Sequence, residues 1–512
     1  MNLKIERETL SVNEKIYDGV GEQSIELDYI LPDYYPDIFK LIRCSIVPVI
    51  TSQSVNGDTL SYEMTADVKI LYSAEGSGQL QCISQRLTYS KSVNLGEAPT
   101  SPDICIRPKS DHINCRAVNK RRIDMRGAVS IKVTVKGESR QEAISDITGM
   151  NVQTKKVPVE YMAKRITAQR VLTVSDDMEL PNTKSAVNDV VRTEISLTET
   201  ESKIISNKLV VKGEAGVKTL YTCKEGMETM EFTVPYSQIV DMDGIDESFK
   251  CYVTADGVSC DITPAADENG ENKTLKYELK LSVRCCAYKT IPIDLVADAY
   301  STAYPCEYAC AELAAPQPPI MISEKFQSKI TLENDESGIS GVYDVWCTAK
   351  NINLTLDSEN KSIKISGMLC CQAMIKNESD LINVLEKDQA FEFEISCDEM
   401  TDSSTAELNI PKIECSYNLT DMNSISVKAD IYIIGELYTS SCFKAVTDIT
   451  VDDSVKITRD GDYAIKLYYG VKDEDIWNIA KKYSTSVSAI MEENSLESEA
   501  LTDNGMLLIP IV

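Results

Sequence analysis

Apolar residues recur at every second position along most of the chain. Stretches such as "LSYEMTADVKILYS", "LTLDSENKSIKISG" and "FEFEISCDE" alternate apolar with polar residues and end at clusters of Gly, Asn, Asp and Ser. Period two is typical of strands with one buried and one solvated face, and Val, Ile, Thr and Tyr suit such surfaces. The pattern predicts a mainly β protein whose antiparallel sheets pack as sandwiches.

One early segment departs from this period. In "LPDYYPDIFKLIR", Ile38, Leu41 and Ile42 follow the helical spacing i, i+3, i+4, and Pro36 suits the first position of a helix. Asp37 would then lie in the first turn, where an acid is favourable against the helix dipole. We therefore expect short helical pieces here.

The chain also repeats itself. Leu31–Arg43 aligns with Leu180–Arg192 at an offset of 149 residues, and Val68–Tyr72 falls on Val217–Tyr221 at the same offset. A second anchor, a turn followed by an alternating run, begins at Asn119, Asn272 and Asn423, with spacings of 153 and 151 residues.

The start of the third copy is more diverged. There, Gly341–Cys347 is expected to occupy the place of Ala186–Arg192 in the second copy. The repeats predict three tandem β-sandwich-like units of about 150 residues and a shorter C-terminal domain. The proline-rich Ala314–Pro319 marks the clearest boundary. We predict domains at 1–165, 166–315, 316–459 and 460–512.

The net charge of −28 over 512 residues argues against nucleic acid and anionic lipid as partners, since both are bound by Lys and Arg. A neutral or basic partner is expected instead. The N-terminus lacks an apolar signal region, and no run approaches the roughly 20 apolar residues that span a bilayer. These features predict a cytoplasmic protein without a transmembrane segment.

Seventeen cysteines are present, an odd number without a CxxC pair. In a reducing cytosol we expect most of them to be small buried hydrophobes, with late oxidative cross-linking as the alternative. The vicinal pairs Cys285–Cys286 and Cys370–Cys371 should split between core and surface, because neighbouring strand residues point to opposite faces.

Catalytic and metal chemistry finds little support. The single histidine, His112, lies in a polar, loop-like "KSDHINC", and there is no phosphate-binding glycine motif. Asp33 and Asp37 could be a paired-carboxylate site, but at the 149-residue offset they become Asn182 and Ala186. We therefore expect no enzyme, no metal and no cofactor, and favour a structural role for this stretch. A hydrolase in the first repeat remains the minor alternative.

After about residue 460 the pattern changes to strand, helix, helix, strand. Ile476, Ile479, Ala480 and Tyr483 form a helical stripe, and Gly505 turns the chain into the closing "MLLIPIV". With "IWNIAKKY", "SVSAIMEENSL" and "LTDNGMLLIP", the segment resembles the LysM domain. That resemblance implies a βααβ fold and binding of N-acetylglucosamine polymers such as peptidoglycan.

The loop before the first helix departs from the family pattern. The family's usual "GDTLW" is here Asp473-Glu474-Asp475-Ile476-Trp477, without the glycine that lets backbone approach a sugar. The extra carboxylates would also need to be desolvated on contact. Binding of a protein is thus at least as well supported as binding of a glycan.

The candidate binding residues lie on two loops of this domain. They are Asp473, Glu474, Asp475 and Trp477 on the first and Asn494, Ser495 and Leu496 on the second. The alternative is that Trp477 belongs to the core and the acids form a solvated helix start.

"LPDYYPDI", "NKRRI" and the terminal LysM-like segment together resemble the SPOCS (spore coat structural) family of clostridial sporulation proteins. The resemblance implies a non-enzymatic scaffold that tethers the coat basal layer around the forespore, in the mother-cell cytoplasm. It implies the stage IV sporulation coat ATPase as partner, contacted through the LysM domain. The alternative is a peptidoglycan-binding protein of cell wall or cortex. Self-association stays open.

Overall fold

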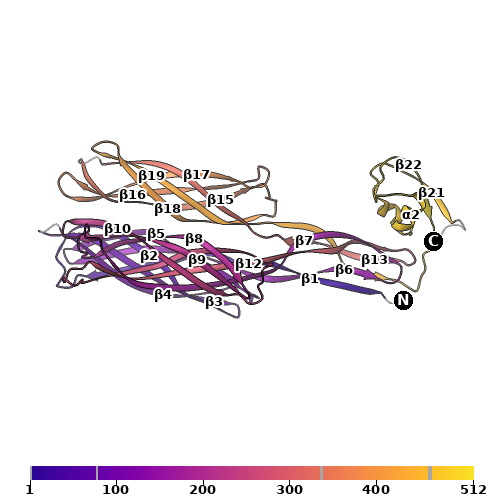
Figure 1. Cartoon of the computed structure of the whole chain (residues 1–512), viewed down its shortest axis with the longest axis horizontal. Helices are drawn as coiled ribbons and strands as arrows, with labels where there is room; N and C mark the ends of the chain where they lie inside the picture. The colour runs from indigo at the N-terminus through magenta and orange to yellow at the C-terminus, as the bar shows by residue number, and fades with distance from the viewer. Residues whose placement is uncertain (1–2, 77–78, 335–337, 459–463, 512) are drawn as a thin grey trace.

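The computed structural model describes residues 3–76, 79–334, 338–458 and 464–511. They form an elongated molecule, with three lobes at one end, paired strands extending from them, and a small C-terminal module at the other end (Figure 1). Almost all regular structure is antiparallel strand, so the predicted mainly β class is confirmed.

Each lobe consists of two three-stranded antiparallel sheets. Lobe 1 contains β1 (Lys4–Ile30), β2 (Ile38–Asn56), β3 (Thr59–Ala74), β4 (Leu80–Asn94), β5 (Asp103–Asn119) and β6 (Arg122–Thr148). Lobe 2 contains β7 (Val152–Glu179), β8 (Val190–Ile205), β9 (Lys208–Cys223), β10 (Gly226–Asp241), β11 (Lys250–Ala265) and β12 (Thr274–Ser301). Lobe 3 contains β14 (Ile320–Glu333), β15 (Ile339–Asp357), β16 (Ser362–Asn377), β17 (Ile382–Ser396), β18 (Thr405–Leu419) and β19 (Ser424–Tyr438).

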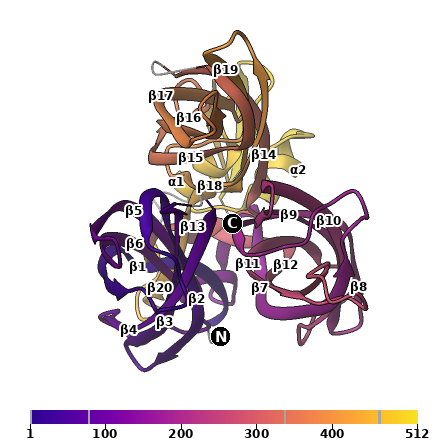
Figure 2. The same cartoon turned by 90° about the vertical axis from the view of Figure 1, so that its left-hand side faces the viewer.

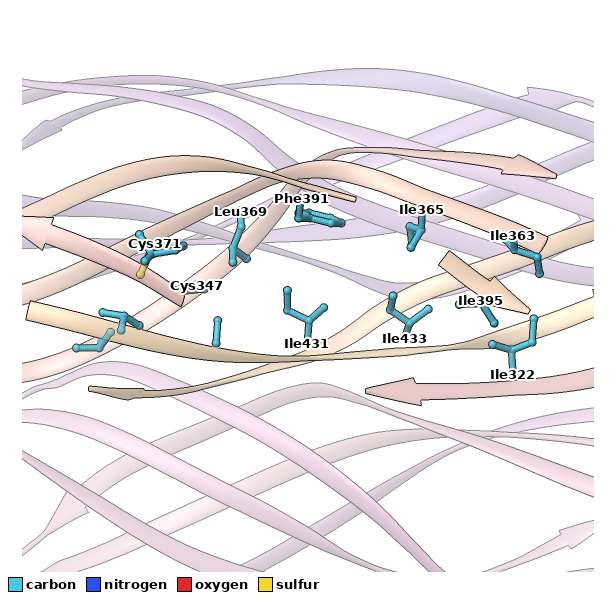
Figure 3. Packing of buried hydrophobic residues seen from close by; sticks show 14 of the residues in the cluster. Ile322, Cys347, Ile363, Ile365, Leu369, Cys371, Phe391, Ile395, Ile431 and Ile433 are labelled. Atoms are coloured by element: carbon cyan, nitrogen blue, oxygen red, sulfur yellow. The ribbon is translucent and has the colours of Figure 1, made fainter. Parts of the chain in front are cut away.

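The strand order is the same in all three lobes. One sheet runs β2-β3-β4, β8-β9-β10 or β15-β16-β17, and the other runs β1-β6-β5, β7-β12-β11 or β14-β19-β18. Apolar side chains of both sheets meet inside each lobe. In lobe 3, Ile363 and Ile365 of β16 face Ile431 and Ile433 of β19, and all four are at most 1% exposed (Figure 3).

Three two-stranded ribbons continue from the lobes toward the module. Ribbon 1 pairs residues 4–15 with 136–148, and ribbon 2 pairs residues 152–164 with 289–301. Ribbon 3 pairs two separate strands, β13 (Cys306–Pro316) and β20 (Ser440–Val451). Each ribbon has a β-bulge at the same place, since Ser145, Ala297 and Thr447 are skipped in the register. The ribbons share apolar clusters to which all three contribute, so they form one stalk.

The predicted boundaries 165/166 and 315/316 fall inside β7 and β13, and 459/460 lies outside the described residues. In the first two lobes the same strands form both ribbon and lobe. The prediction of separate domains at these positions stays a prediction.

The helical pieces expected around Pro36–Ile42 are wrong, because β2 begins at Ile38. Phe39 and Ile42 are bulge residues, skipped in the pairing of β2 with β3. Each bulge shifts the alternation of faces by one residue. Two bulges so close together turn a period of two into spacings of three and four, which imitate a helix.

The expected split of the vicinal cysteines is also wrong. Cys285, Cys286, Cys370 and Cys371 are all at most 1% exposed. In lobe 2 the outer face of the strand is covered as well, and the thiol of Cys286 lies 3.3 Å from Arg165 Nε. All seventeen cysteines are free thiols, and only Cys442 is exposed. His112 lies within strand β5 rather than in a loop.

Viewed along the long axis, the three lobes surround a common axis (Figure 2). Leu71, Leu220 and Met374 of the three lobes share one apolar cluster. Arg43, Arg192 and Asp344 oppose these three residues in the strand pairing, each directly after a bulge. The residue of lobe 3 that corresponds to Arg192 is therefore Asp344, and the expected alignment of Arg192 with Cys347 is wrong by three residues. The sequence alignment could not place the bulges of this diverged segment.

Lobe 3 thus has an acidic residue, Asp344, where lobes 1 and 2 have arginines, and this acid connects the lobes. The Asp344 side chain is 1% exposed and accepts Arg192 Nη1 at 2.8 Å, with Lys218 Nζ at 3.2 Å. Arg43 of lobe 1 lies over the Trp346 ring of lobe 3 at 3.9 Å. Burial, with Arg192 nearby, lowers the pKa of Arg43 to about 10. A carboxylate in lobe 3 thus compensates arginines that would otherwise repel each other on the axis.

A second set of charges lies between the lobes where the ribbons leave them. Asp103 of lobe 1 accepts Arg284 at 2.6 Å and Arg165 at 3.0 Å, both from lobe 2. Lys136 of lobe 1 pairs with Glu407 of lobe 3 at 2.9 Å. Every pair of lobes is therefore connected by partly or fully buried ion pairs.

Candidate functional site

The candidate binding residues lie in the C-terminal module. It contains β21 (Ile465–Gly470), α1 (Ile476–Lys482), α2 (Val487–Asn494) and β22 (Gly505–Pro510), in the predicted order strand, helix, helix, strand. The two strands pair antiparallel. Asp475 and Ser486 cap the helices, because their side chains accept hydrogen bonds from the backbone N–H groups of Trp477 and Ala489.

The module contacts the end of the stalk through α1. Trp477 is 5% exposed, and its ring meets the Tyr300 ring of ribbon 2 edge to face, with 4.9 Å between centroids. Trp477 Nε1 donates to Asp298 Oδ2 at 2.8 Å, and the Tyr300 hydroxyl donates to the Thr485 carbonyl at 2.7 Å. Trp477 is therefore buried, as the alternative interpretation expects. Its ring, however, packs between the module and the stalk.

Lys481, one turn after Trp477, completes this contact. Its ammonium group donates to Asp298 Oδ1 at 2.7 Å and to the Tyr308 hydroxyl of ribbon 3 at 2.8 Å. Burial alone would raise the pKa of Asp298, but hydrogen bonds from Lys481 and Trp477 hold it below its ordinary value. Lys155 of ribbon 2 forms a further ion pair with Asp475.

The other acids of the first loop have different surroundings. Glu474 accepts the Tyr468 hydroxyl at 2.5 Å and the Val471 N–H at 3.1 Å, so it closes the loop on its own module. Asp473 is exposed and has a left-handed backbone with φ of 65°. Of the predicted first-loop residues, the structure brings Asp475 and Trp477 together at the stalk and directs Glu474 elsewhere.

The second predicted loop holds the module together. The Asn494 side chain donates to the carbonyls of Ile490 at 2.8 Å and Leu508 at 2.7 Å, and accepts the Leu508 N–H at 2.7 Å. Ser495 ends α2 in a left-handed conformation, and Leu496 packs against the module's core.

Replacing Asn494 by alanine is expected to destabilise the module by about 1–3 kcal/mol, because it leaves backbone groups of Leu508 without partners. Hydrogen exchange of the full chain would show faster exchange in α2 and β22. Glu493→Ala, at an exposed neighbouring position, is the control. Equal exchange in the two variants would contradict this role of Asn494.

Sequence reasoning missed Lys481, Asp298, Tyr300 and Tyr308. The sequence did contain an indication for Lys481, since this residue lies four positions after Trp477 on the same helix face. The sequence contained no such indication for the stalk residues, because they are far from the module along the chain. A second surface was also missed: Leu467, Tyr469 and Met506 are 63%, 61% and 58% exposed on β21 and β22.

Asp33 and Asp37 both lie near one cation, Arg121, whose Nη2 is 3.9 Å from Asp33 Oδ1. Arg121 Nη1 lies 2.7 Å from Asp37, and Nη2 donates to the carbonyls of Pro32 at 2.9 Å and Leu31 at 3.2 Å. Arg121 thus organises the turn before β2, while the Asp33 side chain is exposed. The geometry supports the structural interpretation of this stretch.

Two further places could bind small ligands. Among the described residues, Cys370, Glu386 and Asp388 bring metal-ligand atoms within 4.8 Å of one another, but Cys370 and Gln372 already donate to Glu386. A hollow of about 680 Å³ lies between the lobes. Arg284 and Glu407, which line it, are paired with charges of other lobes. We assign no ligand to either place.

Residues 186–263 match the family model described as SipL, SPOCS domain. The matched stretch, 78 of the 512 residues, is similar to the SPOCS domain. No match was found among curated proteins, and none among solved structures. The matched family is a non-enzymatic one of sporulation proteins, so the SPOCS domain suggests a sporulation-related coat protein.

The SPOCS match covers β8, β9, β10 and most of β11 in lobe 2. It therefore includes one whole sheet and most of β11, an edge strand of the other sheet, together with Arg192 between the lobes. In the described part of the chain, neither helix has the length and apolar character required to span a membrane.

Proposed function

We propose that the protein is a non-enzymatic scaffold of spore-coat assembly. In this proposal the three lobes are tandem SPOCS-like units, the C-terminal module is a LysM domain adapted to protein binding, and the stage IV sporulation coat ATPase is its partner. The protein would tether the coat basal layer to the forespore from the mother-cell cytoplasm.

The SPOCS match in lobe 2 is the observation that carries this proposal. The same strand order in lobes 1 and 3 supports related units there. Buried charges between the lobes and a shared stalk core join the lobes and ribbons into one elongated body, which suits a tether. Arg284 and Glu407, which line the hollow, are engaged in ion pairs with other lobes.

Several features of the module favour a protein over a glycan as partner. Its first loop lacks the glycine of the LysM pattern, and Asp475 and Trp477 are engaged with the stalk side chains of Lys155 and Asp298 in this structure. Asn494 is used within the module. Lys481 and the indole N–H of Trp477 bind a carboxylate, a group that peptide side chains supply.

A pull-down with the full chain and a chain ending at residue 458 tests the proposal. The baits are the purified ATPase and peptidoglycan sacculi. We expect the ATPase to retain the full chain, and retention to be lost without the module. Retention by sacculi alone would support the alternative, a peptidoglycan-binding protein of wall or cortex.

A further inference from the structure

Ribbon 2 differs from the other ribbons at the point where the module is bound. Asp146, Asp298 and Asp448 follow the bulges of the three ribbons at the same register position. Asp146 pairs with Lys156 at 2.8 Å and Asp448 with Arg7 at 3.3 Å, both within the stalk. Asp298 is instead directed to Lys481 and Trp477 of the module.

Ribbon 2 also differs from ribbons 1 and 3 at the residue two positions after this aspartate. Ribbon 2 carries Tyr300, where ribbons 1 and 3 carry Thr148 and Thr450. Every second residue of a strand lies on the same face, so Asp298 and Tyr300 present a carboxylate and an aromatic ring side by side. Tyr300 is 6% exposed and belongs to the module's own apolar cluster.

We propose that Asp298 and Tyr300 act as an internal ligand, which occupies the α1 face of the module until a partner protein displaces it. The inference rests on the proposed function, because it assigns that partner to Trp477 and Lys481. The partner would supply an extended segment with a carboxylate and an aromatic side chain two residues apart. The stalk and the partner then compete for one surface.

The strength of the contact suits an exchangeable one. At its centre the Asp298 carboxylate accepts from Lys481 and Trp477, and the side chains of Asp298 and Lys481 retain 23% and 32% exposure. Around it lie the Tyr300–Thr485 and Lys481–Tyr308 hydrogen bonds and the Lys155–Asp475 ion pair. Solvent weakens ion pairs at such positions. The aromatic edge contact adds specificity for Tyr300 over threonine. A segment of similar chemistry can therefore replace the stalk without unfolding either part.

Fluorescence of the full chain tests the contact itself. Trp346 and Trp477 are the two tryptophans, so Trp346→Phe leaves Trp477 as the reporter. Adding Asp298→Asn and Tyr300→Thr is expected to raise the acrylamide quenching of Trp477 several-fold, with an unchanged melting temperature of the lobes. Asp448→Asn, at the same position of ribbon 3, is the control and should leave quenching unchanged. Equal quenching in all variants would overturn the proposal.

Binding of the purified ATPase to the same full-length variants tests the competition. Loss of the internal ligand should tighten ATPase binding by about tenfold, because the α1 face no longer has to be released from the stalk before the ATPase can bind. Trp477→Ala should abolish that gain. Unchanged affinity would overturn the competition and direct attention to Leu467, Tyr469 and Met506. If no variant binds the ATPase, the proposed function fails as well, even where Trp477 has become more exposed.

Discussion

Replacing Asp344 by alanine is expected to destabilise the assembly of lobes by about 3–5 kcal/mol, the usual cost of removing one partner from a buried ion pair. Asp344 is the carboxylate that Arg192 and Lys218 contact in the interior, and Arg43 lies close by. Without it, cations from lobes 1 and 2 would be left uncompensated. Urea unfolding followed by the fluorescence of Trp346, which touches this cluster, measures the loss.

Asp448→Ala is the matched control for Asp344→Ala. Its side chain is 67% exposed and pairs with Arg7 at the surface, so the expected loss is below about 1 kcal/mol. Replacing Asp344 by leucine together with Arg192→Met should be less harmful than Asp344→Ala, because one charge of each sign is removed. If Asp344→Ala were as mild as Asp448→Ala, the axial cluster would not hold the lobes together.

Gly435→Ala is expected to cost about 3 kcal/mol through overpacking. A methyl group on Gly435 of β19 would collide with the carbonyl oxygen of Glu407 and lie 2.8 Å from Leu408 Cα, both backbone atoms of β18. The strands would have to separate, which would also disturb the contact of Glu407 with Lys136 of lobe 1. The urea midpoint of the full chain should fall accordingly.

Gly341→Ala provides the comparison within lobe 3. The nearest atom to an added methyl group there is Lys376 Cβ at 4.0 Å, so the expected change is within about 0.5 kcal/mol. Similar midpoints for the two glycine variants would show that β18 can move away from β19 without cost.

These expectations bear on the scaffold role, because a tether transmits position only if its parts keep their places. The lobes and the module lie at opposite ends of the molecule, with the stalk between them (Figure 1). Loss of Asp344 would loosen the lobe end. Loss of Asp298 and Tyr300 would release the module and leave the lobes intact. The two sets of variants therefore separate the rigid body from its terminal binding element.

Much of this architecture was accessible from the sequence, because it depends on local periodicity. Alternation of apolar residues gave the strands and the mainly β class, and the offset of 149 residues related the first two lobes before their sheets were known. The helix stripe from Ile476 to Tyr483 and the turn at Gly505 placed the elements of the module. The strand and helix signals lie within a few turns or strands of the chain, and the repeat needs only the comparison of one segment with another.

Local periodicity fails where bulges or neighbouring lobes intervene. The bulges at Phe39 and Ile42 imitated a helix, and covered outer faces buried both members of each vicinal cysteine pair. The exchange of Arg192 for Asp344 between lobes became visible only through the strand register. Likewise, Trp477 could be recognised as important from sequence, but its neighbours Asp298 and Tyr300 are about 180 residues away. The sequence by itself determined the elements and their repetition, whereas only the tertiary structure decided which charges meet on the axis and which face of the module is covered. The reason is that such pairings depend on packing between lobes, for which a single sequence carries no periodic signal.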